Sequence, residues 1–148
     1  MTNILLFIHI LCGAIWLGGG AINTVILTST KRLNTSQAKP ILQTISNLGK
    51  FVFSPTSMLV FISGMGLISV AGWGFGELWI SLAFTGFILN IILGVVFHPR
   101  AGRSALKAIE ASDYGALKVS IQNWLYVSYI DLVIIISVLA LMVFKPGA

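Results

Sequence analysis

The stretch LWISLAFTGFILNIILGVVFHP, residues 78–99, contains no charged side chain over a length sufficient to cross a lipid bilayer. A helix needs about 20 consecutive apolar residues to span about 30 Å of hydrocarbon. Three further uncharged or nearly uncharged stretches flank it, at residues 1–30, 51–76 and 119–144. These runs do not alternate in polarity as the strands of a membrane barrel do. The sequence therefore predicts an all-α integral membrane protein, an antiparallel four-helix bundle.

We expect one transmembrane domain over residues 1–148, with helices at about 3–28, 51–72, 78–98 and 122–144. The composition excludes a water-soluble protein, because 57% of the 148 residues are hydrophobic and only 9% are charged, against roughly one quarter charged in soluble domains. The first apolar run has no basic region before it, so we interpret it as a retained helix and not as a signal peptide. The single Cys12 excludes an intrachain disulfide.

The basic residues concentrate in two of the three loops. They are Lys31, Arg32, Lys39 and Lys50 in the first loop and Arg100, Arg103, Lys107 and Lys118 in the third. Basic residues near helix ends resist translocation, which predicts that loops 1 and 3 lie in the cytoplasm and that both termini lie outside. The membrane in which we expect the bundle is the cell's inner membrane. Topology and attraction to anionic lipid headgroups explain the basic excess, so no nucleic-acid partner is expected.

Two loops show helical character. Residues 40–51 predict a short interfacial helix that leads into the second span, which Pro55 begins or kinks. Residues 103–118 predict a separate helix on the cytoplasmic surface, interrupted at Gly115. Pro99 is expected to end the third span, with His98 at the membrane interface.

One face of the first helix combines polar side chains with glycines. The members, at steps of three or four residues, are His9, Gly13, Trp16, Gly20 and Asn23. Small residues let a second helix, or a flat ligand, approach the backbone closely. The face therefore predicts either helix packing, with His9 neutral and hydrogen-bonded, or a binding site that uses His9.

Depth restricts the partners of a haem-binding or metal-binding His9. At about 1.5 Å per residue, His98 lies well over 10 Å from His9 along the membrane normal, which disfavours a bis-histidine haem. Met65, in the glycine-flanked segment SGMG, lies near the depth of His9, and a His/Met pair is a known set of axial haem ligands. Methionine is also a common apolar filler. Cys12, three residues from His9, offers a weaker two-ligand copper alternative.

Asn90 and Asp131 are the remaining intramembrane polar residues, at similar predicted depths. A contact between them, with water, satisfies both side chains without placing a charge in lipid. The functional alternative is a proton or ion pathway through Asp131.

Several motifs resemble a small bacterial family of predicted integral membrane proteins of unknown function. They are the pattern H-x6-W-x-G-G, which begins at His9, the tryptophan that opens the third span, the Pro-Arg that closes it, and the terminal MVFKP at residues 142–146. The resemblance covers essentially the whole chain. That family is similar to the copper-resistance D-type proteins and to the four-helix HemJ-type protoporphyrinogen oxidase.

The resemblance to the HemJ-type oxidase implies that His9 is a haem-facing histidine. The lysine of that family's third helix has no match, because residues 78–99 contain none. By this analogy the leading hypothesis is a haem-associated or porphyrin-associated redox protein, with haem b as cofactor and copper as the lesser alternative. A non-catalytic assembly partner or structural protein, or a small metal or ion transporter, are the other hypotheses. The expected partners are the lipid bilayer and a second copy or another membrane protein, through the glycine-rich faces.

Overall fold

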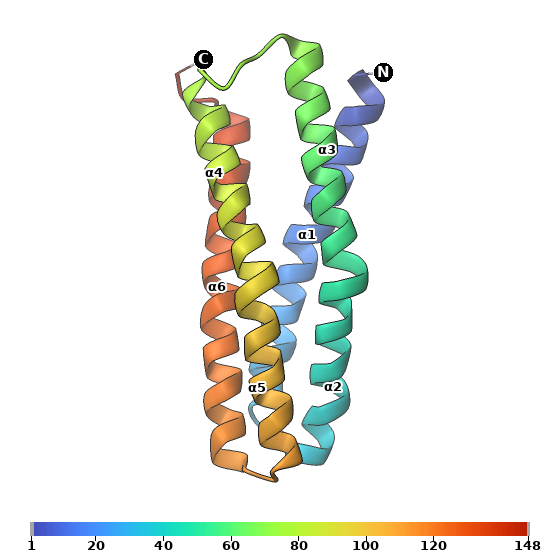
Figure 1. The fold of residues 1–148 in the computed structure, drawn as a ribbon, viewed down its shortest axis with the longest axis vertical. Helices are drawn as coiled ribbons and strands as arrows, with labels where there is room; N and C mark the ends of the chain where they lie inside the picture. Colours follow the sequence, from blue (N-terminus) through green and yellow to red (C-terminus); the bar gives the residue numbers. More distant parts are fainter. Residues whose placement is uncertain (1, 148) are drawn as a thin grey trace.

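The computed structural model describes residues 2–147, and every regular element within them is helical (Figure 1). The elements in chain order are α1 (Thr2–Thr30), α2 (Thr35–Leu48), η1 (Gly49–Phe53), α3 (Ser54–Ala71), α4 (Leu78–Ile92), η2 (Leu93–Phe97), α5 (His98–Glu110) and α6 (Tyr114–Phe144). η1 and η2 are short π-helical segments that join α2 to α3 and α4 to α5 without a break. The chain thus forms four long rods.

The four rods run antiparallel, with both termini at one end and the loops at residues 31–34 and 111–113 at the other (Figure 1). α1 packs against α3 and α6, α6 packs against α4 and α5, and α2 packs against α5. Each rod is long and apolar enough to cross a membrane. The predicted all-α membrane bundle of four helices is confirmed, whereas the side of the membrane that the termini face stays a prediction.

Each π-helical segment ends two residues before a proline. Pro55 and Pro99 occupy the first turn of α3 and of α5. A proline inside an α-helix lacks an N–H group, and its ring collides with the carbonyl four residues earlier. A π-helical turn adds a residue to the turn, which moves that carbonyl away and lets the rod continue. The expectation that the helix stops at Pro99 is therefore wrong, because it continues to Glu110.

The rods are longer than the sequence predicted. They cover 37 residues in Thr35–Ala71, 33 in Leu78–Glu110 and 31 in Tyr114–Phe144. The two helices expected on the membrane surface, at residues 40–51 and 103–118, belong to these rods, and the chain turns at residues 111–113 instead of at Gly115. At about 1.5 Å per residue, 33 residues extend about 50 Å, well beyond about 30 Å of hydrocarbon.

The excess length lies at the end that carries loops 1 and 3, which we call the basic end. Exposed polar side chains cover α2 and α5 there, among them Gln37, Lys39, Arg103 and Lys107. Polar exposure of this kind is typical of helices in water. The basic end therefore stands outside the hydrocarbon as an ordinary four-helix bundle.

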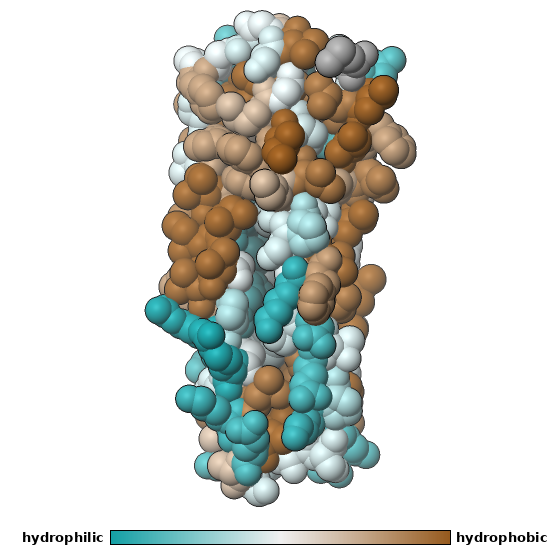
Figure 2. Space-filling view, turned by 45° about the vertical axis from the view of Figure 1, so that its right-hand side comes forward, coloured by the Kyte–Doolittle hydropathy of each residue, from teal (hydrophilic) through white to brown (hydrophobic). Residues whose placement is uncertain are grey.

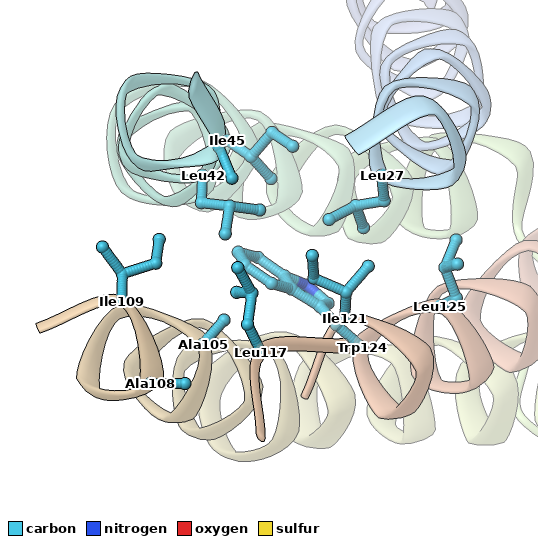
Figure 3. Close-up of a cluster of buried hydrophobic side chains, with 11 residues drawn as sticks. Leu27, Leu42, Ile45, Ala105, Ala108, Ile109, Leu117, Ile121, Trp124 and Leu125 are labelled. Carbon is cyan, nitrogen blue, oxygen red and sulfur yellow. The ribbon is translucent and has the colours of Figure 1, made fainter. Parts of the chain in front are cut away.

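A closely packed apolar core holds the basic end together (Figure 3). Its members come from α1, α2, α5 and α6 and are Leu27, Ala38, Leu42, Ile45, Ala105, Ala108, Ile109, Leu117, Ile121, Trp124 and Leu125. The Trp124 ring lies against Gly102, where an added Cβ would stand 3.1 Å from the ring. Glycine at this position lets α5 approach the indole closely.

Close contacts at glycines and between aromatic rings hold the rods together in the half of the bundle nearer the termini. Leu5 lies over Gly66 on α3, and Val138 of α6 lies where a Cβ of Gly86 would stand. Between α3 and α4, the Phe61 ring stacks on Phe87 with their centroids 5.6 Å apart. Much of the glycine content therefore serves packing within the chain, and the expected oligomer stays a prediction.

Candidate functional site

A cavity of about 320 Å³ lies between the rods, near the middle of their length. Its lining residues come from all four rods and include both π-helical segments: Trp16, Gly20, Asn23, Leu27, Ile45, Ser46, Gly49, Lys50, Phe53, Ser54, Ser57, Asn90, Ile91, Gly94, Val95, His98, Pro99, Trp124, Ser128 and Asp131. Figure 2 shows the face between α2–α3 and α4–α5, where pale and teal surface recedes at mid-height between brown columns. A mostly apolar cavity that also contains a few buried polar and ionisable side chains is typical of a ligand-binding site in a membrane bundle.

Apolar side chains bound the cavity toward both ends of the bundle. On the side of the basic end, Leu27, Ile45 and Trp124 belong both to the cavity wall and to the packed core. On the side of the termini, Trp16 lines the cavity and its ring meets Phe87 edge-on, with 5.8 Å between centroids. The cavity is therefore bounded by packed rings and aliphatic side chains along the bundle axis.

Trp124 and His98 form the first polar contact of the cavity. The indole Nε1–H donates to Nδ1 of His98 over 3.0 Å. Because the indole nitrogen donates only, Nδ1 must accept, so the hydrogen of the neutral ring is on Nε2. The contact defines both the tautomer and the direction of the imidazole.

Asp131 faces the other side of the same imidazole. Its Oδ2 lies 3.9 Å from Nε2 of His98, and the two side chains are 13% and 27% exposed. This distance is longer than a direct hydrogen bond, and a hydroxyl group or water can contact both atoms only from beside the pair, off the line that joins them. The Nε2–H donor and the carboxylate acceptor form the polar centre of the cavity.

Asn90, on α4, adds a buried acceptor to this centre. The residue is 3% exposed and lines the cavity, and its Oδ1 has no hydrogen-bond partner. A buried amide oxygen without a partner costs roughly 1–3 kcal/mol. The expected contact between Asn90 and Asp131 is absent from the hydrogen bonds of residues 2–147: Oδ1 of Asn90 has no partner there, and Asp131 lies 3.9 Å from His98. The two acceptors instead share the cavity.

The exposed rim of the cavity lies at the two π-helical segments. Lys50 and Ser54 form one side of the rim, and Gly94 and Val95 form the other, with Val95 68% exposed. About 20 residues, the length of a span, separate the start of α4 from the end of η2. The rim therefore opens sideways, near the boundary between hydrocarbon and headgroups on the side of the basic end.

The predicted face of α1 divides between two surroundings. Trp16, Gly20 and Asn23 line the cavity. His9 and Gly13 lie nearer the N-terminus, outside the cavity wall. The five residues share a helix face, as the spacing predicted, but α3 covers one part of it and the cavity borders the other.

His9 is held against α3. Its Nδ1 lies 3.0 Å from the carbonyl oxygen of Val60 and 3.1 Å from Oγ of Ser63, and its ring passes over Gly64. A carbonyl only accepts, so Nδ1 carries the hydrogen and donates. These contacts agree with the interpretation of His9 as a neutral, hydrogen-bonded packing residue. The other ring nitrogen, Nε2, takes part in neither hydrogen bond.

The surroundings of His9 do not fit a haem held between His9 and Met65. Val60, Ser63 and Gly64 make the face of α3 that meets His9. With 3.6 residues per turn, Met65 projects from the opposite face of that helix. The pair shares a depth, as predicted, but α3 lies between the two side chains.

Metal-ligating residues do not gather within residues 2–147. No group of three or more His, Cys, Asp or Glu side chains occurs there. Cys12, which could share a metal with His9, is buried. Two ligands on one helical turn make a weak copper site.

Sequence reasoning missed the role of two residues in the cavity. From the sequence, His98 is expected at the membrane interface, whereas in the structure His98 and Trp124 both line the cavity. The spacing of α6 offers a signal, because Trp124, Ser128 and Asp131 are separated by four and three residues and so share one face. All three line the cavity.

Comparison with known proteins identifies a family for the whole bundle. A family model described as a predicted integral membrane protein (DUF2269) matches residues 3–146. No curated protein and no solved structure matches the chain. The match confirms the predicted resemblance to a small family of membrane proteins, and the similarity to the copper-resistance and HemJ-type families stays a prediction.

Proposed function

The chain belongs to this family of predicted integral membrane proteins, and we propose that it binds a small polar ligand or polar head in the cavity. The observation that carries the proposal is the unpartnered Oδ1 of Asn90, which is buried and borders the cavity. Native proteins pair nearly all of their buried polar atoms. A ligand with a hydrogen-bond donor would supply the missing partner.

The His98–Asp131 pair is the proton-exchanging group in this proposal. Oδ2 of Asp131 and Nε2 of His98 are 3.9 Å apart, so one hydroxyl group beside the pair can donate to the Asp131 carboxyl group and accept from Nε2–H of His98. Ionisable residues inside membrane proteins commonly mark binding sites and proton pathways. A proton pathway through Asp131, the alternative expected from the sequence, would therefore also include His98.

Cysteine accessibility tests the proposal without knowledge of the ligand. In a Cys12→Ala background, Ser57→Cys places a thiol on the cavity wall, and Ser137→Cys places one on the exposed outer face of α6. With the protein in nanodiscs, a small charged thiosulfonate should modify Ser57→Cys. Ser137→Cys, which faces hydrocarbon, should stay unmodified, because the thiolate is the nucleophile that attacks the reagent and a thiol ionises only in contact with water.

The comparison of the two thiols decides the outcome. A thiol at residue 57 that reacts as slowly as the thiol at residue 137 would show a dry, closed cavity and overturn the proposal. A bulky charged reagent provides the size control, since it should react poorly with a cavity of about 320 Å³.

A cofactor bound by His9 alone is the second candidate function. Its supporting observation is the ring orientation: Nδ1–H donates to the Val60 carbonyl, which is the arrangement usual for a histidine that ligates iron or another metal through Nε2. Protein purified after expression with haem precursor should then show a Soret band that His9→Ala removes. A colourless protein would leave His9 as a packing residue.

A further inference from the structure

We propose that the ligand of this cavity is an isoprenoid quinol, a flat hydroxylated ring on a hydrocarbon tail, which enters sideways from the bilayer. The inference rests on the proposed function and names its ligand class. It follows from the polar atoms of the cavity, from its aromatic walls and from the position of its rim.

The deep polar atoms of the cavity favour a head that donates hydrogen bonds. The carbonyl oxygen of Asn90 and the carboxyl oxygens of Asp131 accept hydrogen bonds, and the Nε2–H of His98 is a donor beside Asp131. A quinol carries two hydroxyl groups, each able to donate and to accept. A phosphate head would present further acceptors to the Asp131 carboxylate, so charge and hydrogen bonding disfavour it.

The shape of the cavity suits a flat ring. Trp16, Phe53 and Trp124 contribute aromatic rings to its walls, and aromatic groups pack well against one another when offset or edge-on. The volume of about 320 Å³ lies within the range of small-molecule sites. It accommodates one substituted ring and leaves the tail outside.

The rim provides the path for the tail. Gly94 and Val95 of η2, and Lys50 and Ser54 of the second rod, line the cavity and are exposed, near the end of the apolar span. Gly94 has no side chain, and a Cβ there would meet nothing within 4 Å. A tail that leaves between η1 and η2 enters hydrocarbon directly, and the head lies just inside the headgroup level.

The test measures protection of a thiol in the cavity. Full-length Cys12→Ala/Ser57→Cys protein in nanodiscs is mixed, under argon, with a decyl benzoquinol whose other ring positions are all substituted, so that the ring cannot add to the thiol. At about ten times its Kd, the quinol should slow thiosulfonate modification about tenfold. The matched control ligand is the dimethyl ether of the same quinol, which keeps the ring and tail but has no hydroxyl hydrogen.

Two further variants test whether the quinol binds to the side chain of Asn90. Adding Asn90→Leu should abolish protection by the quinol, and Asn90→Ser, which keeps a polar side chain too short to reach the head, should weaken it. Equal protection by the quinol and its dimethyl ether would overturn the inference, as would protection by a short-chain phosphatidic acid alone. If the thiol reacts but the quinol never protects it, the proposed function stands and the quinol assignment fails.

Discussion

The indole Nε1–H of Trp124 donates to Nδ1 of His98 over 3.0 Å, across the interface between α5 and α6. The same ring packs on Gly102 in the core of the basic end. Trp124 therefore connects a well-packed core to the polar centre of the cavity. The orientation of His98 toward Asp131 depends on that connection.

In the Trp124→Phe variant, His98 should no longer be held in a single neutral tautomer. Without the indole donor, Nδ1 loses its partner and both neutral tautomers become accessible. In ¹⁵N spectra of histidine-labelled protein, the wild type should show one His98 tautomer, protonated at Nε2, and the variant a mixture. Trp79→Phe, which removes an indole far from the cavity, should leave the His98 signals unchanged; a wild-type mixture would contradict the assignment.

Asn90→Leu should stabilise the ligand-free protein while abolishing ligand binding. The substitution removes a buried carbonyl that has no partner, which costs roughly 1–3 kcal/mol in the native state. Thermal unfolding in one fixed detergent should give a higher Tm for the variant. A lower Tm would indicate that water already satisfies Asn90 in the wild type.

His9 and Ser63 should show a small, measurable coupling. Nδ1–H of His9 lies between the Val60 carbonyl and Oγ of Ser63, and hydrogen bonds between membrane helices average about 0.6 kcal/mol in double-mutant cycles. The cycle of His9→Ala, Ser63→Ala and the double variant should return a coupling of that order. A coupling of zero would assign the contact of His9 with α3 to the Val60 carbonyl alone.

Gly86→Ala should destabilise the bundle, and Gly18→Ala should not. A Cβ at residue 86 would collide with Val138 of α6, whereas a Cβ at residue 18 would meet nothing within 4 Å. Overpacking of this kind typically costs about 1–3 kcal/mol, while alanine is favoured over glycine in a helix by about 1 kcal/mol. Equal stabilities for the two variants would show that α4 and α6 do not approach as closely as the structure indicates.

Lys145→Gly should be more stable than Lys145→Ala. The Lys145 ammonium lies 4.4 Å from the ring centroid of Trp73 and 5.5 Å from that of Trp79, a contact worth about 0.5–1 kcal/mol at exposed sites. Both variants lose it. Residue 145 also ends α6 with a φ of 43°, which glycine adopts without strain and alanine does not. Unfolding in the same detergent gives the ranking.

The sequence was sufficient to predict the four spans, because a long run without charge is costly to place anywhere but in lipid. It did not predict that the rods continue through Pro55 and Pro99. That continuation depends on π-helical turns, in rods whose neighbouring helices pack together, α2 on α5 and α5 on α6. Local propensity alone favours a helix end at each proline.

The same turns explain why the cavity was only partly predicted. The sequence predicted that Trp16, Gly20 and Asn23 share one face of α1, and all three line the cavity, since the helical periodicity is undisturbed between them. An added residue in η2 rotates everything after it by about 100° relative to a regular helix, so the direction of His98 could not follow from spacing. Trp124 and Asp131 lie on an uninterrupted helix, and their shared face was available in the sequence.

The long rods divide the molecule between two solvents. Around the apolar core of the basic end, water surrounds the helices, so the hydrophobic effect drives their association there. In the hydrocarbon, lipid tails are as apolar as leucine, and only packing and hydrogen bonds favour the native arrangement. Urea and cold act on the first force and scarcely on the second. In urea or in the cold, the helices should therefore separate at the basic end before they separate in the hydrocarbon.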